Sequence, residues 1–180
     1  MLHPCYHAGW DDEQYSAFGL TLQPLTLGHA RCLYILNSPF VVPGDGTISK
    51  DDLLLAASIC SVQRAPINAC GMDDVIDAAG SIAIDVNIII EADKFSAYFK
   101  KYCSVIPRFD STPPQQRVPW PWAYNGILRR YYGYTKQDAW EELCAEAFWL
   151  GVCVAVQNGD TGYATLEEQP IIMMMGKSDG

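Results

Sequence analysis

The chain has 180 residues, of which 49% are hydrophobic and 18% charged, and its formal net charge is −9. A chain of this length and apolar content can bury a core of its own as one domain, which excludes disorder throughout. The acidic balance repels a phosphate backbone, so we exclude nucleic acid as a partner.

The cysteines and the lack of long apolar runs indicate the cellular compartment. The seven cysteines are scattered, and most lie in apolar helical contexts, which is typical of reduced thiols rather than of a disulfide framework. The first residues lack the basic and apolar segments of a secretory signal. Apolar runs stay below the roughly 18 residues that span a bilayer. We therefore expect a cytoplasmic protein that does not enter the membrane.

Residues 1–16 are predicted to form a flexible N-terminal arm. His3, Cys5 and His7 alternate there, and on an extended segment they would present three metal ligands on one side. Zinc sites use wider spacings and a distant second ligand pair, which the sequence lacks. We therefore predict neither a metal nor another cofactor, and interpret the triplet as part of a mobile terminus.

Residues 17–159 are predicted to form a mainly α-helical domain of five or six helices, which begins with a short strand. Partial alternation of apolar residues places the strand within 18–25. Thr26 is an N-cap for the first helix, since its hydroxyl can accept a bond from a free N–H in the first turn. This helix is expected to end near Asn37, because the residue before a proline is pushed out of the α region.

The second helix is expected to begin at Ser49 or Thr47 and to run through KDDLLLAASICSV. Asp51 and Asp52 lie in its first turn, where the helix dipole favours carboxylates. Paired aspartates also suit acid–base or metal chemistry, but capping is a sufficient explanation and is the one we adopt.

Residues 72–79 and 91–102 are predicted to be helical. Residues 82–90 leave two possibilities open, because their β-branched side chains favour a strand whereas their context favours a helix. We choose the helix. Aromatic residues at helical spacing are expected to face the core in the later segment, namely Phe95, Tyr98, Phe99 and Tyr102.

Residues 104–121 are predicted to form a long loop, because repeated prolines exclude a regular helix and favour extended geometry. A loop of this length is usually functional or mobile. Trp120 and Trp122 lie in it, and an exposed tryptophan is a recognition anchor. The alternative is that both rings fold back onto the core.

A helix over 123–132 is expected next, with Pro121 at an early helical position. Arg129 and Arg130 are followed by two tyrosines, which makes a small basic and aromatic patch. In an acidic chain we interpret this patch as a protein contact or a solvated face rather than as an RNA site.

The strongest helical pattern runs from Thr135 to Gly159 and is predicted to be one continuous, mostly enclosed helix. Thr135 is its N-cap, and Asn158-Gly159 is its stop. Apolar residues recur along it at steps of three and four and indicate the domain core: Ala139, Trp140, Leu143, Ala147, Leu150 and Val154.

Residues 160–180 are predicted to be a C-terminal tail with an apolar, methionine-rich end, which is an adaptable kind of binding surface. Whether this end docks on the domain or binds a partner is left open. No catalytic residue is predicted. The candidate partner-binding residues are Trp120, Trp122, Arg129, Arg130, Ile171, Ile172, Met173, Met174 and Met175.

Three segments carry a family resemblance: LTLQPLTLGHARCLYILNSPFV, TISKDDLLLAASICS and GYTKQDAWEELCAEAFWLGVCVAVQNGD. In this order they resemble tail assembly chaperones of long-tailed phages and prophages. Members of that family have a short strand before a helix ending in SPF, then a helix ending in ICS, and a final helix with spaced small residues. The chain departs from the pattern at Glu142-Leu143, where the family has a proline, and in its proline- and tryptophan-rich loop.

The resemblance implies a small, helical, non-enzymatic protein of the host cytoplasm that is absent from the finished virion. It would bind the tape measure protein and the tail tube protein during tail assembly. Many relatives are extended by a programmed frameshift at a slippery run that can encode Gly-Lys. Gly176-Lys177 stands near the end of this chain, so we expect a homopolymeric slip site and an overlapping frame in the coding DNA.

Two rival hypotheses belong to other classes. One is a structural tail protein, such as a completion or adaptor subunit. The other is a small cytosolic enzyme that pairs Cys32 or Cys103 with His29. We rank the enzyme low, because no nucleophile has a base or an oxyanion device at a recognisable spacing. His29 is interpreted instead as a surface or packed imidazole.

Overall fold

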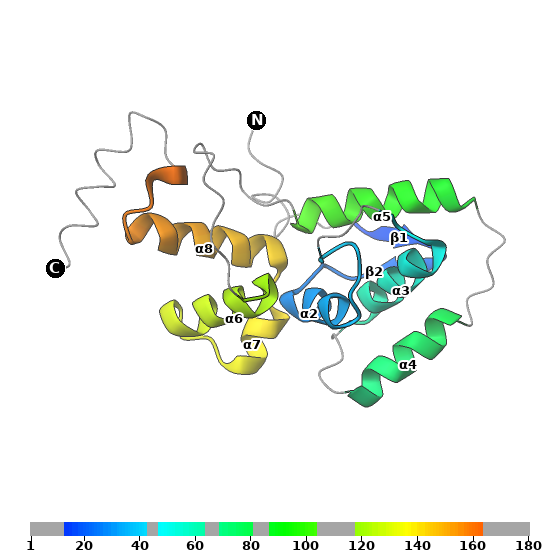
Figure 1. Ribbon diagram of the computed structural model, residues 1–180, viewed down its shortest axis with the longest axis horizontal. Helices are drawn as coiled ribbons and strands as arrows, with labels where there is room; N and C mark the ends of the chain where they lie inside the picture. Colours follow the sequence, from blue (N-terminus) through cyan, green and yellow to red (C-terminus); the bar gives the residue numbers. More distant parts are fainter. Residues whose placement is uncertain (1–12, 43–46, 64–68, 81–86, 104–117, 164–180) are drawn as a thin grey trace.

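The computed structural model describes residues 13–42, 47–63, 69–80, 87–103 and 118–163. Over these residues the chain is mainly α-helical with a small antiparallel sheet near its N-terminal end, as predicted (Figure 1). The elements in chain order are β1 (Tyr15–Ala17), β2 (Leu20–Leu22), α2 (Leu27–Ile35), α3 (Lys50–Ser61), α4 (Ala69–Gly80), α5 (Ile88–Cys103), α6 (Trp120–Tyr131), α7 (Lys136–Glu141), α8 (Cys144–Gln157) and the 3₁₀ turn η1 (Thr161–Tyr163).

The predicted single strand within 18–25 is instead a two-stranded hairpin. β1 and β2 pair antiparallel, with Tyr15 opposite Leu22. Phe18 and Gly19 join the strands with φ values of 55° and 75°. Positive φ at both central residues is the geometry of a two-residue type I′ turn, which matches the twist of the strands.

The prediction of a flexible arm over 1–16 is wrong at its end, because β1 packs against α5. The Tyr15 ring lies 5.7 Å from the Tyr98 ring, and the ammonium of Lys101 lies 5.0 Å from the Tyr15 ring. The backbone N–H of Phe18 also donates to a carboxylate oxygen of Glu91. These contacts join residues far apart in sequence. Residues 1–12 lie outside the described part.

The three predicted N-caps form. The hydroxyls of Thr26, Ser49 and Thr135 each accept a bond from the backbone N–H three residues later. A carboxylate oxygen of Asp52 accepts from the Ser49 N–H at 2.9 Å, which completes a capping box. The capping interpretation of the Asp51-Asp52 pair is therefore confirmed at Asp52.

The prediction of one continuous helix over 135–159 is wrong. The chain leaves helical geometry at Glu142 and Leu143 and forms α7 and α8 on either side. The break pairs with the start of α2 through an isolated bridge between Thr26 and Leu143. The Leu27 N–H donates to the Glu142 carbonyl and the Cys144 N–H to the Leu25 carbonyl, both at 2.9 Å. Tertiary pairing thus replaces the helical bonds lost at the break.

The core lies among α2, α3, α5 and α8, under the hairpin. The aromatic face predicted on α5 is confirmed for Phe95, Tyr98 and Tyr102, which are buried. Four of the six core positions predicted between residues 139 and 154 are buried as well, whereas Leu143 and Leu150 are half-buried. The enclosed aliphatic and aromatic side chains supply most of the driving force for folding.

Two predicted boundaries shift. α5 begins at Ile88, so residues 88–90 are helical as chosen, while 82–86 lie outside the described residues. α6 begins at Trp120, so the end of the predicted loop over 104–121 is helical. Pro121 fits within its first turn, because N–H groups there need no helical partner. Residues 104–117 lie outside the described part.

The helices form two groups along the long axis of the molecule. Figure 1 shows α6, α7 and α8 gathered toward one end, with α4 at the other. α6 packs on α2, α7 and α8, whereas the main contact of α4 is with α3. Among the described helices, none combines the length and apolar character needed to cross a bilayer.

Candidate protein-binding surface

The two predicted tryptophans lie on opposite sides of α6. Trp120 is half-buried, and its ring lies 5.2 Å from that of Phe148 in α8. Trp122 is 37% exposed to solvent. Neither alternative from the sequence therefore holds for both rings: Trp120 packs onto the core, and Trp122 faces outward.

Aromatic neighbours hold Trp122 in place on the surface. Its ring meets Tyr34 of α2 edge-on at 5.6 Å and Trp140 of α7 edge-on at 5.9 Å. The guanidinium of Arg31 lies 5.1 Å from the Trp140 ring. Edge-to-face pairs at these distances are favourable, so an exposed indole is fixed in position before any partner arrives.

The predicted arginines lie exposed in the last turn of α6. The Arg130 guanidinium lies 5.4 Å from the Tyr131 ring, and the Tyr132 hydroxyl donates to the Leu150 carbonyl at 3.0 Å. Arginine at a helix C-terminus also interacts favourably with the helix dipole. We define the aromatic–arginine surface as five exposed residues that run along α6 and around its C-terminal end: Trp122, Arg129, Arg130, Tyr131 and Tyr132.

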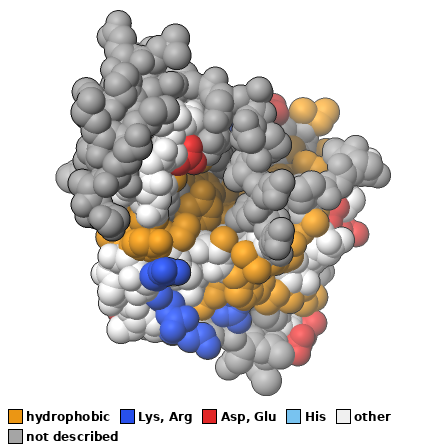
Figure 2. Space-filling view, turned by 60° about the vertical axis from the view of Figure 1, so that its left-hand side comes forward, with side chains coloured by type: hydrophobic (Ala, Val, Ile, Leu, Met, Phe, Trp, Pro, Cys, Tyr) orange, Lys and Arg blue, Asp and Glu red, His pale blue; other side chains and the backbone are white. Residues whose placement is uncertain are grey.

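This surface is positively charged in an acidic protein. α6 contains two arginines and no acidic residue, although the chain carries a formal charge of −9. Figure 2 turns this end of the molecule forward and shows hydrophobic side chains beside a group of Lys and Arg side chains, with most acidic side chains apart from that group. Such a surface attracts an acidic partner.

Sequence reasoning missed the residues of other helices that complete this region. Tyr34 and Arg31 lie one turn apart on α2, and Ile35 beside them is 55% exposed. Trp140 was assigned to the core, and it is buried, but its ring also supports Trp122. Spacing within α2 gives no signal of this role, because it depends on how α2 meets α6.

Several predicted site residues lie outside the described part of the chain. Ile171, Ile172, Met173, Met174 and Met175 lie outside the described residues. The alternating triplet His3, Cys5 and His7 lies outside them too. Within the described ranges, no group of three metal-binding side chains is placed to hold an ion.

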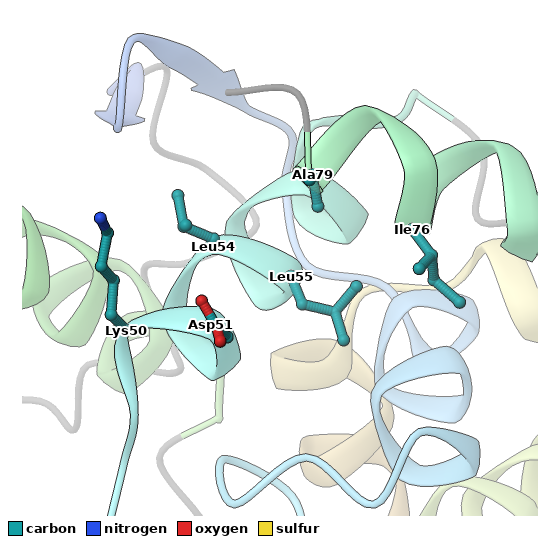
Figure 3. A pocket seen from close by; sticks show the side chains of 7 residues that line it. Lys50, Asp51, Leu54, Leu55, Ile76 and Ala79 are labelled. Atoms are coloured by element: carbon teal, nitrogen blue, oxygen red, sulfur yellow. The ribbon is translucent and has the colours of Figure 1, made fainter. Parts of the chain in front are cut away.

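A groove that the sequence did not predict lies between α3 and α4. Its volume is about 370 Å³, and most of its lining is apolar. Figure 3 shows the side chains of the two helices around it. The lining residues are Lys50, Asp51, Leu54, Leu55, Ile76, Ala79 and Gly80.

His29 has a structural role, as interpreted. It is fully buried, with Nδ1 2.9 Å from the Thr26 hydroxyl and Nε2 2.8 Å from the Val62 carbonyl oxygen. Burial lowers the pKa of His29, which favours the neutral ring. Burial also raises the pKa of Cys32 to about 11, so this thiol is a poor nucleophile near neutral pH.

No family model, curated protein or solved structure matches the chain. Function is therefore inferred from the residues of the chain and their geometry. The aromatic–arginine surface offers the most direct chemistry, because aromatic side chains and arginine are enriched where proteins bind one another.

Proposed function

We propose that the chain acts as a tail assembly chaperone of the long-tailed phage type, which binds the tape measure and tail tube proteins in the host cytoplasm. The observation that carries this proposal is the aromatic–arginine surface, with Trp122 37% exposed yet held by two aromatic neighbours. Tryptophan, tyrosine and arginine dominate binding energy at protein interfaces.

Rigid support makes this surface suited to binding. α6 is held by three other helices, and the Trp122 ring is fixed by contacts with Tyr34 and Trp140. A side chain that is already ordered loses little entropy when a partner binds. The surface can therefore bind an apolar segment of a partner without first rearranging.

The break between α7 and α8 supports the family resemblance. Leu143, at the point where the family has a proline, has a φ of −62°. Glu142 before it is extended, with φ −68° and ψ 142°. Proline requires a φ near −65° and an extended residue before it, so this backbone would accept one. The sequence departs from the family pattern here, but the local geometry fits it.

The hydrogen bonding at the break is also compatible with a proline at position 143. The Leu143 N–H donates to the side chain of its neighbour Glu142, at 3.0 Å, rather than to a helical carbonyl. A proline would give up only this local bond. The same break is bridged to Thr26, so two of the three segments that carry the resemblance meet at this point.

Co-expression tests the proposal. The chain is produced with the tape measure and tail tube proteins of the same phage, and the soluble fraction is analysed by size-exclusion chromatography. We expect co-elution with at least one of them and a higher soluble yield of the tape measure protein. The variant Trp122→Ala/Arg129→Ala should reduce complex formation about tenfold or more, since each residue is an interface anchor.

Lys136→Ala on α7 is the matched control, because Lys136 is an exposed basic residue outside the surface. It should bind like the unmodified chain, and circular dichroism should show that all variants are folded. Failure of the unmodified chain to bind either protein would refute the proposal. Stoichiometric presence of the chain in purified tails would favour the completion or adaptor subunit instead.

A further inference from the structure

Helices α4 and α6 are matched in length and opposite in charge. Each has 12 residues. α6 carries Arg129 and Arg130 with no acidic residue, and α4 carries Asp73, Asp74 and Asp77 with no basic residue. A net charge of −9 opposes self-association, and a local contact between opposite charges offsets that repulsion.

The outer face of α6 forms a stripe with an open centre. Trp122, Gly126 and Arg129 follow the spacing i, i+4, i+7, which places them in one row along the helix, and all three are exposed. A Cβ atom added to Gly126 would meet no atom within 4 Å among the described residues. A second helix can therefore approach the backbone closely between the indole and the guanidinium.

The outer face of α4 has the complementary stripe. Val75 and Ala79 face α3, whereas Asp73 and Asp77 lie on the other side of α4. Gly80 follows them at the spacing i, i+4, i+7 and ends this row at the rim of the α3–α4 groove, which it also lines. All three are exposed. A Cβ atom on Gly80 would likewise meet nothing within 4 Å among the described residues, so there is room for a large side chain against this end of the helix.

We propose that α4 of one copy packs antiparallel against α6 of a second copy. In this register Arg129 meets Asp73, and the Trp122 indole lies over Gly80. The parallel register would place the indole against an aspartate and leave the arginine opposite a glycine. Antiparallel packing also sets the helix dipoles in opposite directions, which is the favourable arrangement.

This contact joins two different surfaces, so in a pair of copies each keeps one of its two surfaces free for a further copy. The copies associate head to tail. Figure 1 shows α4 and α6 well separated along the long axis of the molecule, so one copy can contact two others at once. The contact covers the aromatic–arginine surface. A second copy therefore competes with the tape measure protein, a consequence that rests on the proposed function, whereas the association itself does not.

Paired charge reversals test the contact. One variant carries Asp73→Arg/Asp77→Arg and the other Arg129→Asp/Arg130→Asp, and sedimentation velocity is measured over a range of concentrations. The unmodified chain should associate, and added salt should weaken the association. Each variant alone should associate about tenfold or more weakly, because like charges then face each other.

Mixing the two variants in equal amounts should restore association, because every α4–α6 contact between unlike variants again joins opposite charges. Gly126→Leu in the otherwise unmodified chain should block association by filling the stripe, with an unchanged circular dichroism spectrum. An unmodified chain that stays monomeric, or a folded mixture that does not associate, would overturn the inference.

The outcome is separable from the proposed function. An unmodified chain that binds the tape measure protein but stays monomeric would overturn this inference and leave the chaperone proposal standing. Self-association without binding of either tail protein would do the reverse. If both hold, the charge-reversed α4 variant should bind the tape measure protein more tightly at high protein concentration, since it no longer occupies its own binding surface.

Discussion

Helices α6 and α4 differ most in how the rest of the molecule holds them. α6 packs against α2, α7 and α8, and its exposed Trp122 is supported by rings from two other helices. α4 has its main contact with α3 and leaves a groove of about 370 Å³ beside it. Exposed residues therefore differ between the two helices. On α6 an exposed side chain is held in place by its neighbours, whereas α4 is exposed because other helices cover it only in part.

The largest effect should come from disrupting helix α8, against which α6 packs. Ala147→Pro removes the bond from the Ala147 N–H to the Leu143 carbonyl, which is 2.9 Å long. A proline inside a helix costs about 3 kcal/mol or more, so this variant should be largely unfolded. Urea denaturation followed by circular dichroism measures the loss.

Leu143→Pro is the matched control, because the backbone at Leu143 already has a φ of −62°. It should change the free energy of unfolding by no more than about 1 kcal/mol, the net of lost side-chain packing and a stiffer unfolded chain. A loss as large as that of Ala147→Pro would contradict the geometry of the break.

The next effect concerns the close approach of α6 to α8. A Cβ atom on Gly151 would lie 2.4 Å from Cε1 of Tyr124, so the partly buried Tyr124 ring or one of the two helices must shift. Gly151→Ala should therefore destabilise the fold by about 1–3 kcal/mol. The melting temperature of the variant, compared with that of the unmodified chain, measures the change.

Gly126→Ala is the control on the same helix pair, because it adds the same methyl group where the structure describes no neighbour. It should stabilise α6 by about 0.5–1 kcal/mol, since alanine is the better helix former. If the two alanines shift the melting temperature equally, the packing of α6 on α8 is not as close as the structure shows.

Hydrogen exchange should separate the two helices directly. The backbone amides of α4 should exchange about tenfold or more faster than those of α6 and α8, because a helix held mainly on one side opens at lower free energy. Exchange measured by mass spectrometry on peptic fragments resolves the two regions. Equal protection of α4 and α6 would erase the contrast between them.

The smallest effect should appear on acidification, and on the α5 side of the molecule. The Lys94 ammonium, 2.6 Å away, and the Phe18 N–H hold the pKa of Glu91 below its ordinary value of 4.5. A depressed carboxyl pKa adds stability above that ordinary value, and the contribution is lost as the pH falls through the lower, folded-state pKa. Part of the acid sensitivity of unfolding should therefore come from Glu91.

Glu91→Gln should remove that part, so its urea midpoint should fall less between pH 5 and about pH 3 than that of the unmodified chain. Glu141→Gln, at an exposed position of α7, is the control and should leave the pH dependence nearly unchanged. An unaltered pH profile in the Glu91 variant would show that its carboxylate does not stabilise the hairpin.

Local features and core-facing residues were predictable from the sequence, whereas contacts between particular distant segments were not. The N-caps at Thr26, Ser49 and Thr135 depend on bonds within one turn, and all three form. The break at Glu142 and Leu143 interrupts a strongly helical pattern, because the chain pairs there with residues at the start of α2. No spacing within the segment indicates that partner.

The candidate site divides in the same way. The arginines and tyrosines at the end of α6 are adjacent in sequence and were found as a patch. The outward position of Trp122 depends on where α6 begins, and the predicted loop over 104–121 concealed that start. The contribution of Tyr34 depends on the packing of α2 against α6, which leaves no pattern in either segment alone.

The bridge between Thr26 and Leu143 also bears on how the protein is made. The N-terminal end is synthesised first, yet the backbone groups of Leu25 and Leu27, which are fully buried in the folded protein, find their partners Cys144 and Glu142 only after the start of α8 has emerged. Until then this part of the nascent chain exposes hydrophobic side chains that are buried in the folded protein. A truncated product that stops short of this junction should thus be a target for cellular proteases.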